Sequence, residues 1–328
     1  MGLTRTGAAV LAFADAFVAA RSVSDRQLRI LRAALHGLRE HALFDNGSAT
    51  LPCLDLVPLV FASITGDETA AIPLAAATAF VYLGADILDD LADGDTRPHW
   101  AGYAHGEIAL AGATCLASLP QALIGDLDVP PSVRDRLQTT LSRGLMQMAA
   151  GQHDDLAFAG AAEVPSPDIE RAVAGKTGEE FAVFCRLAAE LAQVSEPLAE
   201  SYSQIGRAIG IGGQLACDCH ELFQDPAGRD FAAGNRTLPV ALRLDRIAGI
   251  PRAEFLATLT QARTDESARQ TIRATLRTGG ELRRCAFAVE VHRQRALRLL
   301  AAANPRERVA VGLRTIIDEI SFFAGISS

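Results

Sequence analysis

Residues 70–93 read AAIPLAAATAFVYLGADILDDLAD, and this stretch decides the fold. From Ala70 to Leu88 the only charged side chain is Asp86, so the segment predicts a helix that is buried almost all round. Four aspartates in its second half follow the spacing of one helical face and are Asp86, Asp89, Asp90 and Asp93. A buried helix that ends in carboxylates predicts an acidic group at the mouth of a cavity.

The acidic face has two interpretations. Like charges one helical turn apart oppose helix formation by a few tenths of a kcal/mol per pair, so we expect a positive group to compensate them. Clustered hard oxygen ligands suit Mg²⁺, which keeps several waters and often bridges to substrate phosphates. The alternative is a solvated acidic surface, because the DDxxD spacing alone arises easily in an acidic chain.

Composition extends the helical interpretation to the whole chain. Hydrophobic residues make up 49% of the 328 residues, aromatic residues only 5%, and strand-like alternation is almost absent. We therefore expect an all-α protein of ten or so helices, in a single domain over residues 1–328. The turn signals are short and evenly spread, and lie at 45–47, 66–67, 94–95, 126–131, 165–167 and 226–228.

Charge and cysteine usage exclude some partners. The net charge of −8 and the lack of a basic run with interleaved aromatics argue against nucleic acid. The six cysteines form no CxxC pair, which is typical of a reducing compartment, so we expect a cytoplasmic location and five inert, buried thiols. The apolar stretch from Thr69 to Ala85 contains Pro73 and leads into aspartates, so we expect a buried helix and no membrane span.

A second acidic group lies in residues 210–242. Asp218 and Glu221 are one helical turn apart, with Asp225 a turn further on. An ordinary helix end before a proline is the alternative interpretation. Zinc is not expected, because the neighbouring residues Cys217, Cys219 and His220 point to different sides of a helix.

The segment AGKTGEE, residues 174–180, holds Lys176, the only lysine against 30 arginines. A helix that begins near Lys176 would offer free backbone N–H groups and a positive dipole end to an anion. The segment is not a Walker loop, because no GxxxxGK precedes it. A surface lysine is the alternative interpretation.

The order of these segments resembles one family, the trans-type isoprenyl diphosphate synthases, also called the polyprenyl synthetase family. AAATAFVYLGADILDD (75–90) is similar to the helix that leads to the first aspartate-rich motif of the family. GQHDDL (151–156), GKT (175–177), GQLACDCHE (213–221) and GRDFAAGNRTLP (228–239) resemble the family's GQxxDL segment, its Lys-Thr pair, its second aspartate-rich motif and the tail of that motif. The similarity spans about residues 45–245.

The resemblance implies a class I isoprenoid synthase fold, a single helical bundle around a central cavity. It also implies an allylic prenyl diphosphate as substrate, up to three Mg²⁺ ions with the bound diphosphate, and a homodimer. The metal ligands implied are Asp89, Asp90, Asp93, Asp218 and Glu221. The catalytic residues implied are Asp89, Asp90, Asp93 and Lys176. The substrate-binding residues implied are Arg97, Gln152, Lys176, Thr177, Gln214 and Arg236, and the pocket wall also includes Asp155.

The departures concern the second substrate. Residues 46–52 read NGSATLP where the family has GGKRxRP, whose basic residues hold isopentenyl diphosphate, and the family's histidine falls on Tyr82. A diphosphate needs charge-assisted hydrogen bonds, and there is no Lys or Arg between Arg39 and Arg97. The second motif is also incomplete, with Cys217 in place of an aspartate and Asn235 in place of the tail lysine.

Three functions are compatible with this pattern. We favour a terpene-synthase-like enzyme that ionises one prenyl diphosphate, of C15 to C20 or longer because Gly84 and Ala85 leave the usual pocket-floor positions open; close helix packing is the alternative for these two residues. A prenyltransferase is the second, with Arg32 or Arg39 replacing the missing pair. A non-catalytic partner subunit of a heteromeric synthase is the third.

Overall fold

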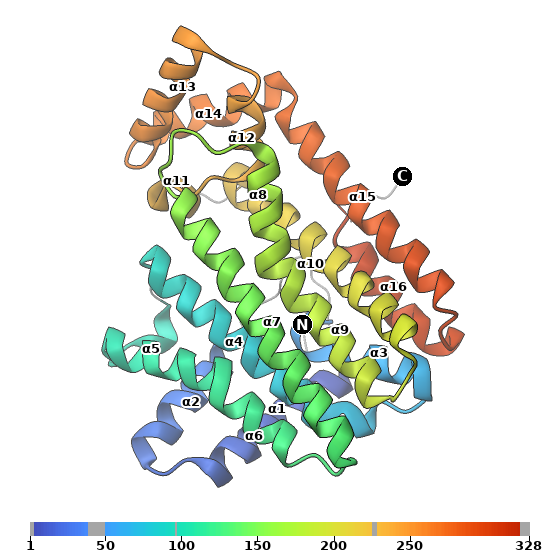
Figure 1. Ribbon diagram of the computed structural model, residues 1–328. Coiled ribbons are helices and arrows are strands. Elements are labelled where there is room, and N and C mark those ends of the chain that lie inside the picture. Colours follow the sequence, from blue (N-terminus) through green and yellow to red (C-terminus); the bar gives the residue numbers. More distant parts are fainter. Residues whose placement is uncertain (1–2, 39–49, 96, 225–227, 322–328) are drawn as a thin grey trace. The chain divides into compact units, whose positions relative to one another are not determined.

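The computed structural model describes residues 3–38, 50–95, 97–224 and 228–321, and in these ranges the chain forms helices and no strand (Figure 1). The all-α prediction is confirmed. The helices outnumber the ten or so expected.

The helices follow one another along the whole described chain. The α-helices are α1 (Arg5–Arg21), α2 (Asp25–Leu38), α3 (Pro52–Thr65), α4 (Ile72–Asp93), α5 (His105–Ala113), α6 (Leu119–Gly125), α7 (Pro131–Phe158), α8 (Ser166–Val173), α9 (Glu179–Leu191), α10 (Glu196–Gln224), α11 (Arg229–Ala233), α12 (Leu238–Leu244), α13 (Gly249–Ala262), α14 (Glu266–Gly279), α15 (Glu281–Ala302) and α16 (Glu307–Glu319). Two 3₁₀ turns, η1 (Thr69–Ala71) and η2 (Pro98–Trp100), and two π-helical turns, η3 (Thr114–Ser118) and η4 (Ala174–Gly178), complete them.

Glycine and proline set several of the helix ends that the sequence predicts. Gly66 and Gly94 take the left-handed conformation, with φ of 92° and 77°, and end α3 and α4. Pro131 begins α7, and Pro165 precedes α8. The predicted turns at 45–47 and at 226–227 lie outside the described residues.

The described chain divides into two compact units. Unit 1 takes residues from 1–143, 183–204 and 299–319, and unit 2 takes residues from 144–182, 205–298 and 320–328. The aspartates of residues 86–93 belong to unit 1, and Lys176, Asp218 and Glu221 belong to unit 2. The single domain over 1–328 stays a prediction.

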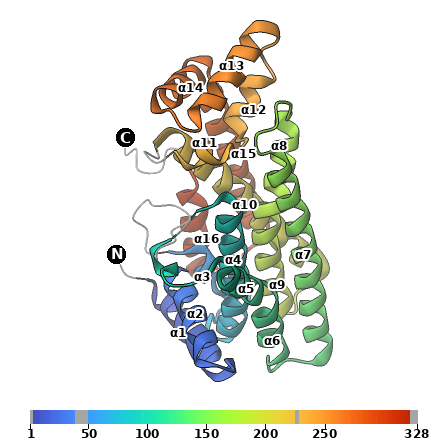
Figure 2. The ribbon, with the colours of Figure 1, turned by 90° about the vertical axis from the view of Figure 1, so that its left-hand side faces the viewer.

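Helix α4 is the centre of unit 1. It packs against α1, α3, α5 and α6, and α3 packs in turn against α16. Every residue from Leu74 to Gly84 is buried, as the absence of charge in this stretch predicts. Figure 2 shows α1 and α3 beside α4.

Gly84 lies where α4 meets the π-helical turn η3. A Cβ atom at Gly84 would lie 2.4 Å from the backbone nitrogen of Leu116 and 2.7 Å from the carbonyl oxygen of Gly112. The structure therefore favours close helix packing at Gly84 over an open pocket floor, while Ala85 is half-buried. Gly84 therefore does not indicate the length of the prenyl chain of the substrate.

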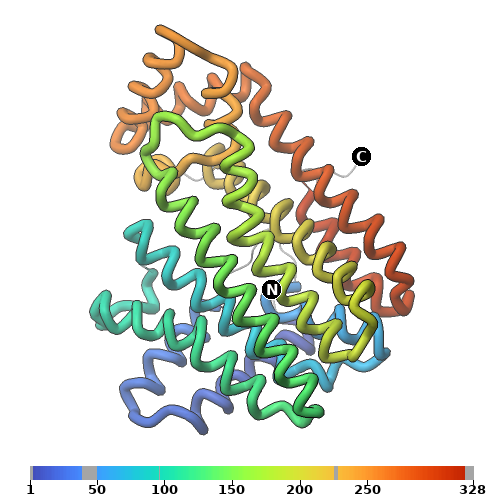
Figure 3. Tube along the Cα trace, in the orientation of Figure 1, coloured from blue at the N-terminus to red at the C-terminus, as the bar shows by residue number. Residues whose placement is uncertain are grey.

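Unit 2 contains a helical hairpin, α13 and α14, which Figure 3 traces in orange. Its apolar residues pack on the last turn of α10 and on α11 and α12. The buried members of this cluster are Leu222, Phe223, Phe231, Val240, Leu244, Phe255, Leu259, Ala262, Ala268, Ile272 and Leu276. A second cluster joins α8, α10, α12 and α15 through residues such as Ile169, Leu215 and Val289.

Two helical stretches of the described chain are long and apolar enough to cross a membrane, Thr69–Asp93 and His105–Gly125. In the first, 67% of the most apolar window is buried inside the protein, as in the core helix of a globular domain. This burial fits the expected buried helix.

Candidate functional site

One group of candidate site residues lies at the C-terminal end of α4, in unit 1. Asp86, Asp89 and Asp90 are half-buried, and Asp93 is exposed and directly precedes the left-handed Gly94 that ends the helix. Carboxylates at the negative end of a helix dipole are unfavourable unless a cation lies near them. The residue that supplies this charge is Arg97.

Arg97 is the compensating positive group that the spacing of the aspartates predicts. Its Nη2 donates to Asp90 Oδ1 at 2.8 Å and to Asp86 Oδ1 at 3.2 Å, and its Nε donates to the second oxygen of Asp90. Burial acts to lower the pKa of Arg97, but the hydrogen bond to Asp90 and the charges of Asp86 and Asp90 raise it overall. The clustered carboxylate oxygens of this face fit Mg²⁺ because they are hard ligands, and Arg97 would compete with the ion for those of Asp90.

No preformed metal cage accompanies this arrangement. Across the described ranges, no three His, Cys, Asp or Glu side chains lie together closely enough to hold one ion. Mg²⁺ commonly keeps several waters and needs only one or two carboxylates beside the substrate phosphates, so such a cage is not required.

A separate group of candidate site residues lies in unit 2, on α10 and η4. Thr177 Oγ1 donates to Gln214 Oε1 at 2.7 Å, and Gln214 Nε2 donates to Asp218 Oδ1 at 2.7 Å. This chain of hydrogen bonds brings Thr177, Gln214 and Asp218 together, and their roles in binding stay predictions. Glu221 lies one turn further on, 3.8 Å from a guanidinium nitrogen of Arg229.

Asp218 is held in an environment that favours its neutral form. Burial raises the pKa of Asp218 to about 7, against the hydrogen bond from Gln214, and the charges of Asp155 and Glu221 add to the rise while Lys176 opposes it. A nearby cation would stabilise the ionised form of this carboxyl and so lower its pKa. Asp225, which would continue the acidic face, lies outside the described residues.

Cys217 stands in the position of a motif aspartate and is half-buried. Burial, and then the charges of Asp218 and Glu221, raise the pKa of its thiol to about 12, so it is a neutral thiol at pH 7. The six cysteines are free thiols, and the other five are buried as expected. His220, by contrast, is exposed.

Lys176 lies beside this network in the π-helical turn η4. Its Nζ is 3.1 Å from Asp155 Oδ2 and its side chain is 23% exposed. The predicted helix start at Lys176 is wrong, because α8, η4 and α9 form one continuous helical run over residues 166–191. The lysine offers its own ammonium, without a helix N-terminus.

Two glycines allow neighbouring helices to pack closely on η4. A Cβ atom at Gly151 would lie 2.4 Å from the backbone of Gly175 and Lys176, and one at Gly210 would lie 2.3 Å from the Thr177 carbonyl oxygen. Helices α7 and α10 therefore both approach the backbone of η4 closely. Glycine inside a long helical pattern is a signal of such packing, and Gly151 and Gly210 both carry it.

Other predicted residues have different surroundings. Gln152 is half-buried on α7. Arg236 donates to the Ala161 carbonyl at 2.7 Å and to the Gly234 carbonyl at 3.4 Å, so it holds the loop after α7 to the loop after α11. Burial, and then the charge of Arg263, lower the pKa of Arg236. Its role in substrate binding stays a prediction.

The segment that replaces the family's basic motif is described only from Thr50 onward. Leu51 is 6% exposed and its N–H donates to Asp55 Oδ2 at 2.8 Å. Asp55 is itself 3% exposed and accepts from Thr4, while Tyr82 is also buried. A carboxylate therefore lies beside this segment, where a diphosphate would need cations.

The sequence offers two arginines as substitutes for the basic motif, Arg32 and Arg39. Arg32 makes a two-hydrogen-bond pair with Asp15, at 2.8 and 3.0 Å. Arg39 lies outside the described residues.

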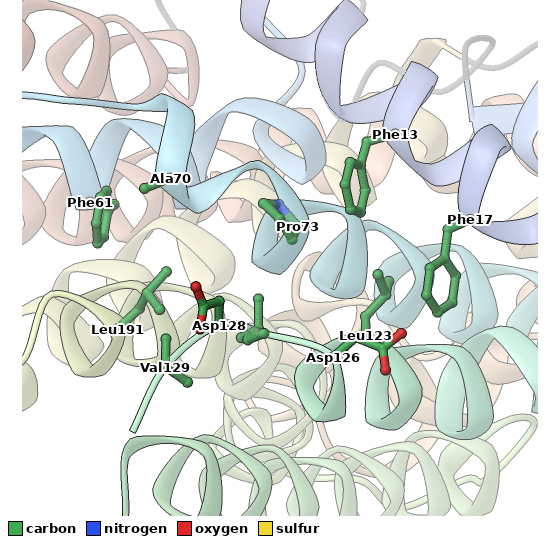
Figure 4. A pocket seen from close by; sticks show the side chains of 11 residues that line it. Phe13, Phe17, Phe61, Ala70, Pro73, Leu123, Asp126, Asp128, Val129 and Leu191 are labelled. Atoms are coloured by element: carbon green, nitrogen blue, oxygen red, sulfur yellow. The ribbon is translucent and has the colours of Figure 1, made fainter. Parts of the chain in front are cut away.

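Unit 1 also contains an apolar cavity of about 520 Å³, beside the N-terminal end of α4 (Figure 4). Phe13 and Phe17 of α1, Phe61 of α3 and Leu191 of α9 supply apolar walls, and Asp128 lies at its rim. Its volume is typical of small-molecule pockets. Pro73 in its wall is about 24 Å along α4 from Asp89, from the helical rise of about 1.5 Å per residue.

Comparisons with known proteins agree on one family. The family model described as polyprenyl synthetase matches residues 53–276. The chain is similar to a geranylgeranyl pyrophosphate synthetase from Pyrococcus horikoshii Ot3, with 20% identity, a TM-score of 0.80 and coverage of 96% of this chain and 95% of that chain. It is also similar to a polyprenyl synthetase from Streptomyces coelicolor A3(2), with 18% identity, a TM-score of 0.81 and coverage of 97% and 98%.

A third structure carries ligands. It is a polyprenyl synthase from Caulobacter crescentus complexed with calcium and isoprenyl diphosphate, with 21% identity, a TM-score of 0.75 and coverage of 98% of this chain and 95% of that chain. No curated protein matches the sequence. The solved structures confirm the all-helical prenyl synthase fold for this chain.

Proposed function

The chain belongs to the polyprenyl synthetase family, whose model matches residues 53–276, and from this premise we propose that it ionises one allylic prenyl diphosphate and converts the cation into a terpene by cyclisation, elimination or water capture. The substrate is a prenyl diphosphate of C15 to C20 or longer. The observation that carries the proposal is the contrast between the network around Lys176 and the uncharged, partly buried segment at Thr50–Pro52.

The residues around Lys176 suit one diphosphate. The ammonium of Lys176 supplies a mobile positive charge, and Thr177 and Gln214 supply polar groups fixed by their mutual hydrogen bond. Asp218 and Glu221 in unit 2, and Asp89, Asp90 and Asp93 in unit 1, would hold Mg²⁺. When bound, Mg²⁺ supplies the positive charge that a leaving diphosphate requires.

The surroundings of Leu51 do not suit a second diphosphate. Leu51 and Tyr82 are buried, and Asp55 adds a carboxylate instead of a cation. Arg32 is already paired with Asp15. Without isopentenyl diphosphate as acceptor, the allylic cation reacts with its own double bonds, with water or with a base.

A prenyltransferase is the second candidate. The similar proteins named above are polyprenyl and geranylgeranyl synthetases. In that case the enzyme elongates its substrate or transfers the prenyl group to an unusual acceptor.

A non-catalytic partner subunit is the third candidate. It is favoured by the neutral thiol of Cys217 at a motif position, by Asn235 in place of a lysine, and by the hold of Arg97 on Asp90. Such a subunit would retain the fold and bind diphosphate without turnover.

One set of incubations separates these functions. The protein with MgCl₂ and geranyl, farnesyl or geranylgeranyl diphosphate, each with and without isopentenyl diphosphate, is assayed for pyrophosphate and for extracted products. Pyrophosphate and a hydrocarbon or alcohol without isopentenyl diphosphate support the proposal, and strict dependence on isopentenyl diphosphate refutes it. If the wild type releases no pyrophosphate and forms no product in any incubation, the non-catalytic subunit is favoured. Asp90→Asn is the inactive control for the first two outcomes.

For its setting we propose a cytoplasmic homodimer that contacts neither nucleic acid nor the membrane interior. The burial of the more apolar segment, Thr69–Asp93, supports the last point. Sedimentation tests the homodimer, and cell fractionation tests the cytoplasmic location.

A further inference from the structure

The hairpin of α13 and α14 makes an unusual contact with the end of α10. Its arginine Arg273 is 4% exposed, inside the apolar cluster that contains Leu222 and Phe231. An aliphatic side chain would fill such a position without the cost of burying a charge. Arg273 instead makes polar contacts that an aliphatic side chain could not make.

Arg273 binds a backbone group of α10 in a fixed direction. Its Nε donates to the carbonyl oxygen of Leu222 at 2.8 Å, and its Nη1 donates to Glu266 Oε1 at 2.9 Å. The guanidinium also lies over the ring of Phe231, 5.4 Å from the centroid. Three separate contacts hold this guanidinium in one orientation.

The Leu222 carbonyl belongs to the last turn of α10, which ends at Gln224. The last four carbonyls of a helix have no partner within the helix, and they form the negative end of its dipole. Asp218 and Glu221 add two carboxylates to the same end. A buried cation on the Leu222 carbonyl offsets this excess of negative charge and prevents the last turn from fraying.

Neighbouring arginines hold the chain beyond α10. A Cβ atom at Gly228 would lie 2.7 Å from Arg269 Nη1, and Arg269 in turn binds the carbonyls of Ala262 and Arg263 at 2.7 and 3.0 Å. The guanidinium of Arg277 lies over the Phe223 ring at 5.3 Å. The hairpin thus contacts the last turn of α10 at Leu222 and Phe223 and lies close to Gly228 beyond it.

We propose that Arg273 is a positioning residue, which fixes the last turn of α10 and thereby the direction in which Asp218 and Glu221 present their carboxylates. This inference rests on the proposed function, in which these carboxylates hold Mg²⁺ against a diphosphate. Arg273 acts through the Leu222 carbonyl and does not touch the substrate.

Arg273→Met tests the inference, because methionine keeps an apolar side chain in the cluster and removes the hydrogen bond to Leu222. In the protein alone, we expect amide hydrogen exchange in peptides covering 216–224 and 228–237 to accelerate about tenfold, with 249–262 unchanged. With inorganic pyrophosphate present, we expect the Mg²⁺ concentration for half-saturation, measured by calorimetry, to rise about tenfold.

Arg277→Met is the matched control, since Arg277 lies one turn further along α14, is exposed and stacks on α10 without bonding its carbonyls. It should change both readouts less than about twofold, and Arg273→Lys, which keeps a donor, should fall between the two methionine variants. Unchanged exchange in 216–224 for Arg273→Met overturns the inference. Accelerated exchange throughout 249–279 in both Arg273 variants also overturns it, because the role is then purely structural. If wild type binds no Mg²⁺ with pyrophosphate, the proposed function fails, while the exchange of the protein alone still decides whether Arg273 orders α10.

Discussion

Lys176 is the only ammonium side chain, and it has an acidic partner. Its backbone is in contact with Gly151, and its Nζ lies 3.1 Å from Asp155. The planar guanidinium of an arginine has a different shape and donor geometry. We therefore expect Lys176→Arg to lower kcat/KM for the preferred prenyl diphosphate by at least about tenfold, and Lys176→Met by about a hundredfold.

The control for this prediction is Arg171→Lys. Arg171 is exposed on α8 and pairs only locally with Asp168, so its replacement should leave kcat/KM within a factor of about two. If Lys176→Arg is as active as wild type in steady-state kinetics, Lys176 has no special role in binding diphosphate.

Asp218 makes metal binding depend on pH. Its pKa is raised to about 7, above its ordinary value, so the carboxyl is protonated below that pH and must release its proton before it binds Mg²⁺. From pH 8 to pH 6 we expect the Mg²⁺ dissociation constant, measured by calorimetry with pyrophosphate, to rise about tenfold, with proton release at the lower pH.

Asp218→Asn should remove the part of this pH dependence that exceeds the titration of pyrophosphate itself, together with most of the affinity. Asp154→Asn is the matched control, because Asp154 is exposed on α7 and should leave the pH profile unchanged. Equal Mg²⁺ affinity at pH 6 and pH 8 in the wild type would refute the assignment.

At the scale of single residues, the sequence predicts the chemical groups of the candidate site better than it predicts the contacts between them. The spacing of the aspartates required a nearby cation, and Arg97 supplies it. The helix start expected near Lys176 is wrong, because α8, η4 and α9 form one helical run. Gly175 lies inside this run against Gly151 of α7, a contact that no local pattern contains.

At the scale of elements, Gly84 fixes the distance between α4 and the π-helical turn η3. A Cβ atom there would overlap the backbone of Leu116, which cannot move as a side chain can. We expect Gly84→Ala to lower the free energy of unfolding by about 1–3 kcal/mol in urea titrations. Gly106→Ala is the control, since a Cβ atom there meets nothing within 4 Å, and it should be neutral or slightly stabilising. An altered product length with unchanged stability in Gly84→Ala would instead indicate a pocket floor.

The long helices were predictable because each signal is local. The uncharged run of α4 predicted its burial, and Gly66, Gly94 and Pro131 marked helix ends. The π-helical turn η3 was not predictable, because it depends on how α5 and α6 pack on α4. The same limit applies to the candidate site, whose members were found by motif but whose hydrogen bonds depend on packing between helices.

At the scale of the whole molecule, the boundaries between the two units fall inside helices, at residues 143–144 of α7 and 204–205 of α10. Separating the units within a helix would break backbone hydrogen bonds, so we expect one cooperative unfolding transition. The single tryptophan, Trp100, is buried in unit 1 and reports on that unit by fluorescence.

A substitution in unit 2 can therefore test cooperativity from unit 1. Glu281 is fully buried in unit 2, with one carboxylate oxygen 3.0 Å from Arg246 and 3.8 Å from Arg243. Glu281→Ala should lower the free energy of unfolding by about 2–3 kcal/mol, less than for a fully buried pair because both arginines reach water. If the domain is single, Trp100 fluorescence and far-ultraviolet circular dichroism shift by the same urea concentration. Glu254→Ala, at an exposed position of unit 2, should shift neither signal. A Trp100 transition that stays at its wild-type midpoint in Glu281→Ala would mean that the two units unfold independently.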